Sequence, residues 1–182
     1  MDDKKTVLVI DDTEYIRSSI SGMLEEMPEI GSVLMAEDGL VGFKLMRQNT
    51  VDLVLCDLIM PEIDGFKFLG LKASSNDFND IPVILLTGQD DVDSKVKGLN
   101  AGASDYVIKP CNSEELVARV RVHLEIKQLQ DTLRQKNTEL ELLTRIDPLT
   151  NVANRRHFMH SIEVEFARLE RYERPMSFAM LD

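Results

Sequence analysis

Short apolar segments alternate with amphipathic ones through the first two thirds of the chain. Because the apolar runs are continuous and too short for helices that are buried all round, they predict strands of a parallel sheet covered on both faces. Apolar residues at three- and four-residue steps predict helices between them. The expected strands are Thr6–Asp12, Ser32–Ala36, Val51–Asp57, Pro82–Thr87 and Ser104–Ile108, and the expected helices are Thr13–Glu26, Gly39–Arg47, one after the turn at Pro61–Gly65, and Val92–Asn100.

This alternation predicts the fold class, an α/β domain with a five-stranded, doubly wound parallel sheet and right-handed crossovers. In the flavodoxin-like strand order 2-1-3-4-5, the crevice that binds ligands lies between the first and third strands, outside their carboxyl ends. Side chains at those two strand ends are therefore the first candidates for a functional site.

A long helix is expected after this domain, because no proline occurs between Ser113 and Pro148. Its apolar residues follow alternating steps of three and four, which is typical of a coiled-coil seam. We predict a helical stalk over residues 113–146 that extends the last helix of the first domain and pairs with a second copy. A single amphipathic helix packed on its own domain is the alternative. The seam comprises Val122, Ile126, Leu129, Leu133, Leu140 and Leu143, with Lys136 as its one polar interruption.

The final segment, residues 147–182, has the pattern of the beginning of a second α/β domain. Asp147 and Pro148 fit an N-cap followed by a first-turn proline, and Asn154–Arg171 follows as a helix. The closing MSFAMLD is an apolar run ending in an acid. Since one strand and one helix cannot bury a core, we expect this domain to be incomplete.

The formal net charge of -11 is carried almost entirely by the first 112 residues. Neither part offers the basic surface that neutralises several phosphates, which disfavours a DNA-binding segment. No run approaches the roughly 20 apolar residues that span a bilayer, and the acidic start does not fit a signal peptide. We therefore expect a cytoplasmic protein with no membrane or DNA partner, in which Cys56 and Cys111 are buried and reduced.

Three acids, Asp11, Asp12 and Asp57, end the first and third expected strands. Three carboxylates at one sheet edge repel each other by roughly 4 kcal/mol per pair at about 4 Å and an effective dielectric of about 20. Either one acid stays protonated or a cation binds, and oxygen ligands alone favour Mg²⁺. Because Mg²⁺ retains waters or phosphate oxygens, such a site suits a phosphoryl group.

Two further strand ends supply groups that phosphoryl chemistry needs. Thr87 offers a hydroxyl and Lys109 an ammonium, both expected at the same edge. A carboxylate can itself be the nucleophile and form an acyl phosphate, while cations neutralise the transferring group.

A flavin- or nucleotide-binding protein of this topology is disfavoured, because no phosphate-binding loop follows the first strand. A haloacid-dehalogenase-like phosphatase is disfavoured as well, because it would need the motif D-x-D-x-T at the first strand, where this chain has the adjacent acids Asp11 and Asp12.

The motifs IDD, LCDLIMPEIDG, LLTG and DYVIKP together resemble the receiver domain of bacterial two-component response regulators, over residues 4 to about 125. The domain is assigned to residues 1–125. The resemblance implies that Asp57 accepts a phosphoryl group from a sensor histidine kinase or phosphotransfer protein. It also implies Mg²⁺ binding by Asp12 and Asp57 directly, by the backbone carbonyl of Ile59, and by Asp11 through water.

The same resemblance implies roles for residues on the last two strands. Thr87 and Lys109 would contact the phosphoryl oxygens, and Tyr106 matches the aromatic residue that turns inward as Thr87 moves. The peptide between Lys109 and Pro110 is one that the family usually holds in the cis form. Phosphorylation would then change the face made by the fourth helix, fifth strand and fifth helix, and a homodimer would form through that face and the stalk.

The segment RIDPLTNVANRRHF, followed by RPMSFAMLD, resembles the opening of a GGDEF-type diguanylate cyclase domain. The departure is Asn151 in place of the usual glycine, and asparagine also tolerates left-handed backbone. Asp182 would be the first metal-binding acid of that cyclase. The Gly-Gly-Asp/Glu-Glu-Phe signature does not occur in these 182 residues, so we expect them to make no cyclic di-GMP.

Two hypotheses follow. One is a switch, a response regulator that relays phosphorylation through a dimerising stalk to a cyclase output. The other is an enzyme, a diguanylate cyclase active only in a longer parent chain, of which these residues are the non-catalytic regulatory part.

Overall fold

The computed structural model describes residues 4–88, 92–143, 145–147 and 149–172 of the chain. The chain divides into two compact units, Met1–Gln130 and Asp131–Asp182. The helix α5 begins in the first unit and continues into the second.

The first unit is built on a five-stranded parallel sheet in the order β2-β1-β3-β4-β5, which confirms the predicted fold class. The order changes direction at β1 and β3, so the predicted crevice lies at their carboxyl ends. The observed strand boundaries differ from the predicted ones by up to two residues, and one difference bears on the site: β1 ends at Ile10, so Asp11 and Asp12 lie in the loop that follows it. The strands are β1 Lys5–Ile10, β2 Ile30–Ala36, β3 Leu53–Asp57, β4 Val83–Thr87 and β5 Asp105–Ile108.

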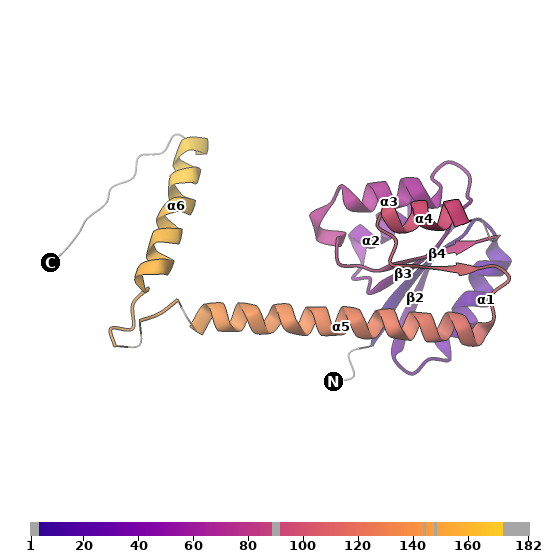
Figure 1. Ribbon diagram of the computed structural model, residues 1–182, viewed down its shortest axis with the longest axis horizontal. Coiled ribbons are helices and arrows are strands. Elements are labelled where there is room, and N and C mark those ends of the chain that lie inside the picture. The colour runs from indigo at the N-terminus through magenta and orange to yellow at the C-terminus, as the bar shows by residue number, and fades with distance from the viewer. Residues whose placement is uncertain (1–3, 89–91, 144, 148, 173–182) are drawn as a thin grey trace. The chain divides into compact units, whose positions relative to one another are not determined.

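Helices cover both faces of this sheet (Figure 1). Side chains of α1 and α5 pack on one face, and those of α2 and α3 pack on the other. Asp38 and Asp64 cap α2 and α3, each accepting a hydrogen bond from a backbone N–H in the first turn. The helices are α1 Glu14–Glu25, α2 Gly39–Gln48, α3 Gly65–Ala73, α4 Val92–Asn100, α5 Ser113–Leu143 and α6 Arg155–Tyr172, with a short 3-10 helix η1 at Asn76–Phe78.

The core has two apolar layers separated by the sheet. Alternate residues of β1 enter different layers, because successive side chains of a strand point to opposite faces. Leu8 and Ile10 pack with Phe68 of α3 on one side, while Val7 and Val9 pack with Leu24 of α1 on the other. Both faces are buried, as the continuously apolar strands predicted.

The helix α5 is attached to the sheet by its first three turns. Leu116, Val120 and Leu124 are buried against the layer that α1 also covers. Beside them, Asp105 of β5 accepts a hydrogen bond from Arg119 (Nη1 to Oδ2, 2.7 Å) and lies 3.3 Å from the ring of His123. Apolar packing and an ion pair together hold the start of α5 on β5.

Substitution of Asp105 by asparagine is expected to lower the stability of the domain at neutral pH. Although burial raises the pKa of Asp105, its hydrogen bonds with Arg119, Tyr106 and His123 outweigh that effect and lower the pKa. A carboxyl with a depressed folded-state pKa stabilises the fold above its unfolded pKa, and this contribution is lost as pH falls through the folded pKa. Urea unfolding of wild type and variant should therefore differ at pH 7 and converge in strong acid. A difference that persists unchanged in acid would contradict this account.

The second unit differs from prediction at its turn. Asp147 Oδ1 accepts hydrogen bonds from the backbone N–H groups of Leu149 and Thr150, both at 3.0 Å, so it closes a turn. The prediction that Asp147 caps a helix is wrong: α6 begins at Arg155, and Asn154 caps it by accepting from the N–H of His157. Asp and Asn side chains both favour helix caps and turns, so the sequence allows Asp147 either role. In the structure Asp147 closes the turn and Asn154 caps the helix.

Asn151 adopts the left-handed conformation, with φ of 56°, which its side chain tolerates. The predicted closing strand and Asp182 lie outside the described residues. Among the helices that the structure describes, none is both long enough and apolar enough to cross a membrane. Both thiols are free, with Cys56 buried as predicted and Cys111 only half-buried.

Candidate phosphoryl site

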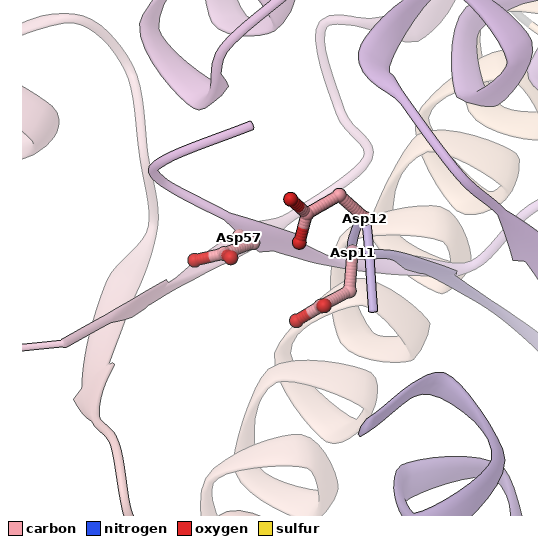
Figure 2. A group of neighbouring side chains, drawn as sticks. All are labelled: Asp11, Asp12 and Asp57. Carbon is pink, nitrogen blue, oxygen red and sulfur yellow. The ribbon is translucent and has the colours of Figure 1, made fainter. Parts of the chain in front are cut away.

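Three carboxylates gather at the carboxyl ends of β1 and β3. One oxygen each of Asp11, Asp12 and Asp57 can be chosen so that all three lie within 4.8 Å of one another. Figure 2 shows the three side chains near one another, Asp11 and Asp12 in the loop after β1 and Asp57 at the end of β3. Their exposure is graded: Asp11 is buried, Asp57 is half-buried and Asp12 is exposed. The structure thus brings together the three acids that the sequence predicted.

Asp11 is held rigidly at the inner wall of the site. Its Oδ1 accepts a hydrogen bond from the N–H of Thr13 at 2.9 Å, and its backbone carbonyl accepts from Arg17 Nη1 at 2.6 Å. The Thr13 contact stabilises the turn that leads from β1 into α1. Because the Asp11 side chain is 0% exposed, its charge needs a fixed partner within the protein.

Lys109 supplies that partner and links two of the acids. Its Nζ lies 2.5 Å from Asp11 Oδ2 and 3.1 Å from Asp57 Oδ2. The backbone places it there, because the N–H of Lys109 donates to the carbonyl of Thr87 at 2.6 Å, at the end of the β4–β5 ladder. One ammonium therefore faces three carboxylates, which leaves the site with excess negative charge.

Burial and neighbouring charge shift the ionisation of both central groups. Burial raises the pKa of Asp57, and the charge of Asp11 raises it further, while Lys109 and the N–H of Ile59 only partly oppose this. For Lys109, burial disfavours the ammonium, but its hydrogen bonds and charge interactions with Asp11 and Asp57 outweigh that effect and raise its pKa. At neutral pH the lysine is charged, and an added cation would relieve the remaining repulsion.

The other predicted site residues lie close by. Thr87 is 6% exposed at the end of β4, in register with Ile108, directly before Lys109. Tyr106 is half-buried on β5 and packs against the core layer that contains Phe68. Ile59 follows β3, where its N–H binds the Asp57 carboxylate and its side chain is exposed. The predicted roles of these residues remain predictions, as does that of Asp182, which lies outside the described residues.

Gly65 and Arg17 are structural supports that sequence reasoning missed. A Cβ atom at Gly65 would lie 2.8 Å from the carbonyl oxygen of Asp57 and 3.0 Å from Leu58 Cα. Glycine thus lets the start of α3 approach the end of β3. The Asp-Gly pair after the third strand was a usable signal, whereas nothing in the spacing indicated that Arg17 binds the carbonyl of Asp11.

The peptide between Lys109 and Pro110 is cis, as the resemblance implied. It follows β5 directly, next to the hydrogen bond between the Lys109 N–H and the Thr87 carbonyl.

Comparison with known proteins agrees with this fold. Residues 7–121 match the family model described as the response regulator receiver domain. The response regulator MprA of Mycobacterium bovis is 34% identical over 165 residues, which cover 90% of this chain and 70% of that protein.

Solved structures give the same result. The receiver domain of the Francisella response regulator 1452 is 33% identical, with a TM-score of 0.61 over 67% of this chain and 98% of that one. A response regulator from Chloroflexus aurantiacus is 30% identical, with a TM-score of 0.63 and the same coverage.

The fold and the acid site define a phosphorelay receiver, and the chain belongs to the response regulator receiver family of two-component systems. Receivers of this family pair with sensor histidine kinases and generally bind Mg²⁺ at an acidic cluster.

Proposed function

We propose that this chain is a phosphorylation-controlled switch in which Asp57 accepts the phosphoryl group from a phosphohistidine of its kinase or phosphotransfer partner. The observation that supports this most directly is the cluster of Asp11, Asp12 and Asp57, with Lys109 contacting two of the three acids. Of the three, Asp57 ends β3 and is half-buried, so it combines a fixed position with access from solvent.

In the proposed transfer, an oxygen of Asp57 attacks the phosphorus and forms a new P–O bond while the P–N bond to the donor imidazole breaks. The imidazole keeps the electron pair and takes a proton. Lys109 and Thr87 would bind phosphoryl oxygens. Two contacts support these roles: Lys109 contacts Asp57, and the Lys109 N–H donates to the carbonyl of Thr87. Lys109 would then exchange its contact with the free carboxylate for one with the phosphoryl group.

Asp12, Asp57 and the backbone carbonyl of Ile59 would hold Mg²⁺, with Asp11 acting through water. These residues fit the ion, since they offer only oxygen ligands and the three carboxylates face one lysine. The bound ion would neutralise charge on the transferring group. Asp12 is suited to direct ligation because it is exposed and its described contact, from Thr13 Oγ1 at 3.1 Å, leaves its other oxygen available.

Removal of the metal is expected to abolish phosphorylation. Incubation with acetyl phosphate and Mg²⁺ should add one phosphoryl group per chain by intact mass, and excess EDTA should reduce labelling at least about tenfold. Asp12→Asn should weaken Mg²⁺ binding measured by calorimetry by about tenfold or more, by analogy with the loss of supporting groups at metal sites. Asp77→Asn, an exposed acid in η1, is the matched control and should change neither result. Full labelling in EDTA would refute the metal requirement.

Signal output is proposed to run through Thr87 and Tyr106 to the face of α4, β5 and α5, and then through a dimerising stalk. The ion pair between Asp105 and Arg119 supports this route, because it joins the strand that carries Tyr106 to α5. The stalk residues Ile126, Leu129 and Leu133 are exposed in the single chain, as expected of a surface that pairs with a second copy.

The proposed output is a diguanylate cyclase domain that begins near residue 147. Two local observations support it: Asn151 takes the left-handed conformation where the family commonly has glycine, and the Asn-Arg-Arg motif opens α6 with Asn154 as its cap. A longer chain from the same gene should convert GTP to cyclic di-GMP, faster when its receiver is phosphorylated. A downstream sequence without the Gly-Gly-Asp/Glu-Glu-Phe signature would refute this output.

A further inference from the structure

A stripe of large apolar side chains runs along α5 from Val122 to Leu140, and its described members are Val122, Ile126, Leu129, Leu133 and Leu140. Its members are between 43% and 62% exposed, whereas Leu116, Val120 and Leu124, on the face toward the sheet, are buried. Steps of four and three residues place the stripe on one side of the helix. In heptad terms Ile126, Leu133 and Leu140 take position a, and Val122 and Leu129 take position d.

Lys136 occupies the next d position and breaks the stripe. Its Nζ lies 2.8 Å from Oε2 of Glu139, three residues along the same helix, and both side chains are more than half exposed. Glu139 takes position g, at the edge of the stripe. The charge of Lys136 in the middle of the stripe is therefore compensated by Glu139 of the same helix. This ion pair is exposed to solvent and contributes little stability.

The charges beside the stripe favour a parallel pair of helices over an antiparallel one. In a parallel pair, g residues face the e residues of the partner in the next heptad, so Glu125 would face Gln130 and no like charges would meet at these flanking positions. An antiparallel pair centred on the stripe would bring Glu125 opposite Glu139 of the other helix, twice per dimer. Like charges held opposite each other are destabilising.

We propose that the occupant of this stripe is a second copy of the chain in parallel register, and that Lys136 is a specificity residue that weakens the pairing so that it depends on the receiver. The proposal rests on the receiver switch proposed above. In a parallel pair the two Lys136 side chains face each other at one d layer, next to Leu133 and Leu140. A polar residue at a single core position fixes register at a cost in stability.

The parallel register also suits the proposed output. It places the segments after both stalks at the same end of the dimer, and a reaction that joins two GTP molecules needs two such domains together. Because the layer formed by the two Lys136 side chains would weaken the pairing, the stalk would not dimerise by itself. Pairing of the receivers would then supply the remaining free energy of dimerisation.

The test is the dimer dissociation constant of the whole chain, measured by sedimentation equilibrium without phosphorylation. Lys136→Leu should tighten the dimer at least about tenfold, since it replaces a charged layer by a buried leucine pair. Lys136→Met, which removes the ammonium at similar length, should act in the same direction. Gln135→Leu adds the same leucine one position off the stripe and should leave the constant unchanged. Glu139→Gln should weaken the dimer, because it leaves Lys136 uncompensated.

Register is read separately by oxidative cross-linking of a Leu140→Cys variant in a Cys56→Ala, Cys111→Ala background. A parallel dimer should give a covalent dimer, whereas an antiparallel pair should give none. Equal tightening by Gln135→Leu and Lys136→Leu, or absence of the cross-link in a dimer, would overturn the proposal. If every variant stays monomeric even with beryllofluoride and Mg²⁺, this inference fails, while phosphorylation of Asp57 still stands on its own labelling test.

Discussion

Asp57→Asn is expected to abolish phosphorylation of the chain by acetyl phosphate and Mg²⁺. The amide keeps the shape of the side chain but is not a nucleophile, and no other described acid combines the end of β3 with contact to Lys109. Intact-mass spectrometry should find one added phosphoryl group on the wild type and none on the variant. Asp77→Asn removes an exposed acid of η1 and should be labelled as fully as the wild type.

The same substitution is expected to stabilise the metal-free domain. Burial raises the pKa of Asp57, with a further contribution from Asp11, so the folded state disfavours the carboxylate relative to the unfolded chain. A group with a raised folded-state pKa lowers the stability as pH rises from its unfolded pKa through its folded pKa. Above the folded-state pKa of Asp57 the wild type carries this full cost, and the asparagine variant does not. Urea unfolding in EDTA should show the variant to be more stable, and a less stable variant would refute this account of the Asp57 charge. Labelling that survives the substitution would refute the assignment of Asp57 as the phosphoacceptor.

Gly65→Ala is expected to destabilise the domain and to disturb the phosphoryl site together. The added Cβ would lie 2.8 Å from the carbonyl oxygen of Asp57 and 3.0 Å from Leu58 Cα, distances at which backbone must move. Overpacking of this kind costs about 1–3 kcal/mol. The strain falls on the strand end that carries Asp57, so the rate of labelling should fall as well.

Gly70→Ala on the same helix is the matched control. Apart from its chain neighbours and the backbone of its own helix, no atom lies within 4 Å of a Cβ built at Gly70, so the new methyl group meets open space. Alanine within a helix is favoured over glycine by about 0.5–1 kcal/mol, which should make this variant slightly more stable. The thermal unfolding temperatures of the two variants should move in opposite directions, and only Gly65→Ala should be labelled more slowly. Equal effects would mean that helix propensity, and not the approach of α3 to β3, determines the role of Gly65.

The hydrophobic pattern of the sequence predicted the strands of the sheet well and the residues at which elements begin and end less well. The five strands and their order followed from apolar runs and alternation, because buried parallel strands have few other sequence patterns. The end of β1 at Ile10 did not follow, since the side chain of Asp11 accepts a hydrogen bond from the N–H of Thr13 in the turn after the strand. At Asp147 the sequence allowed a cap or a turn, and the bonds to Leu149 and Thr150 decided for the turn.

The sequence by itself determined the class of this protein. Strand ends at one edge of a parallel sheet must meet, so Asp11, Asp12, Asp57, Thr87 and Lys109 could be assembled before any coordinates, and the family match to residues 7–121 agrees. Only the tertiary structure decided which of these side chains are buried and which of them form ion pairs. In the structure the side chain of Asp11 is completely buried, and Lys109 contacts both Asp11 and Asp57. The start of α3 packs closely against the end of β3 at Gly65. Such details depend on distances between residues far apart in the chain, which periodicity does not encode.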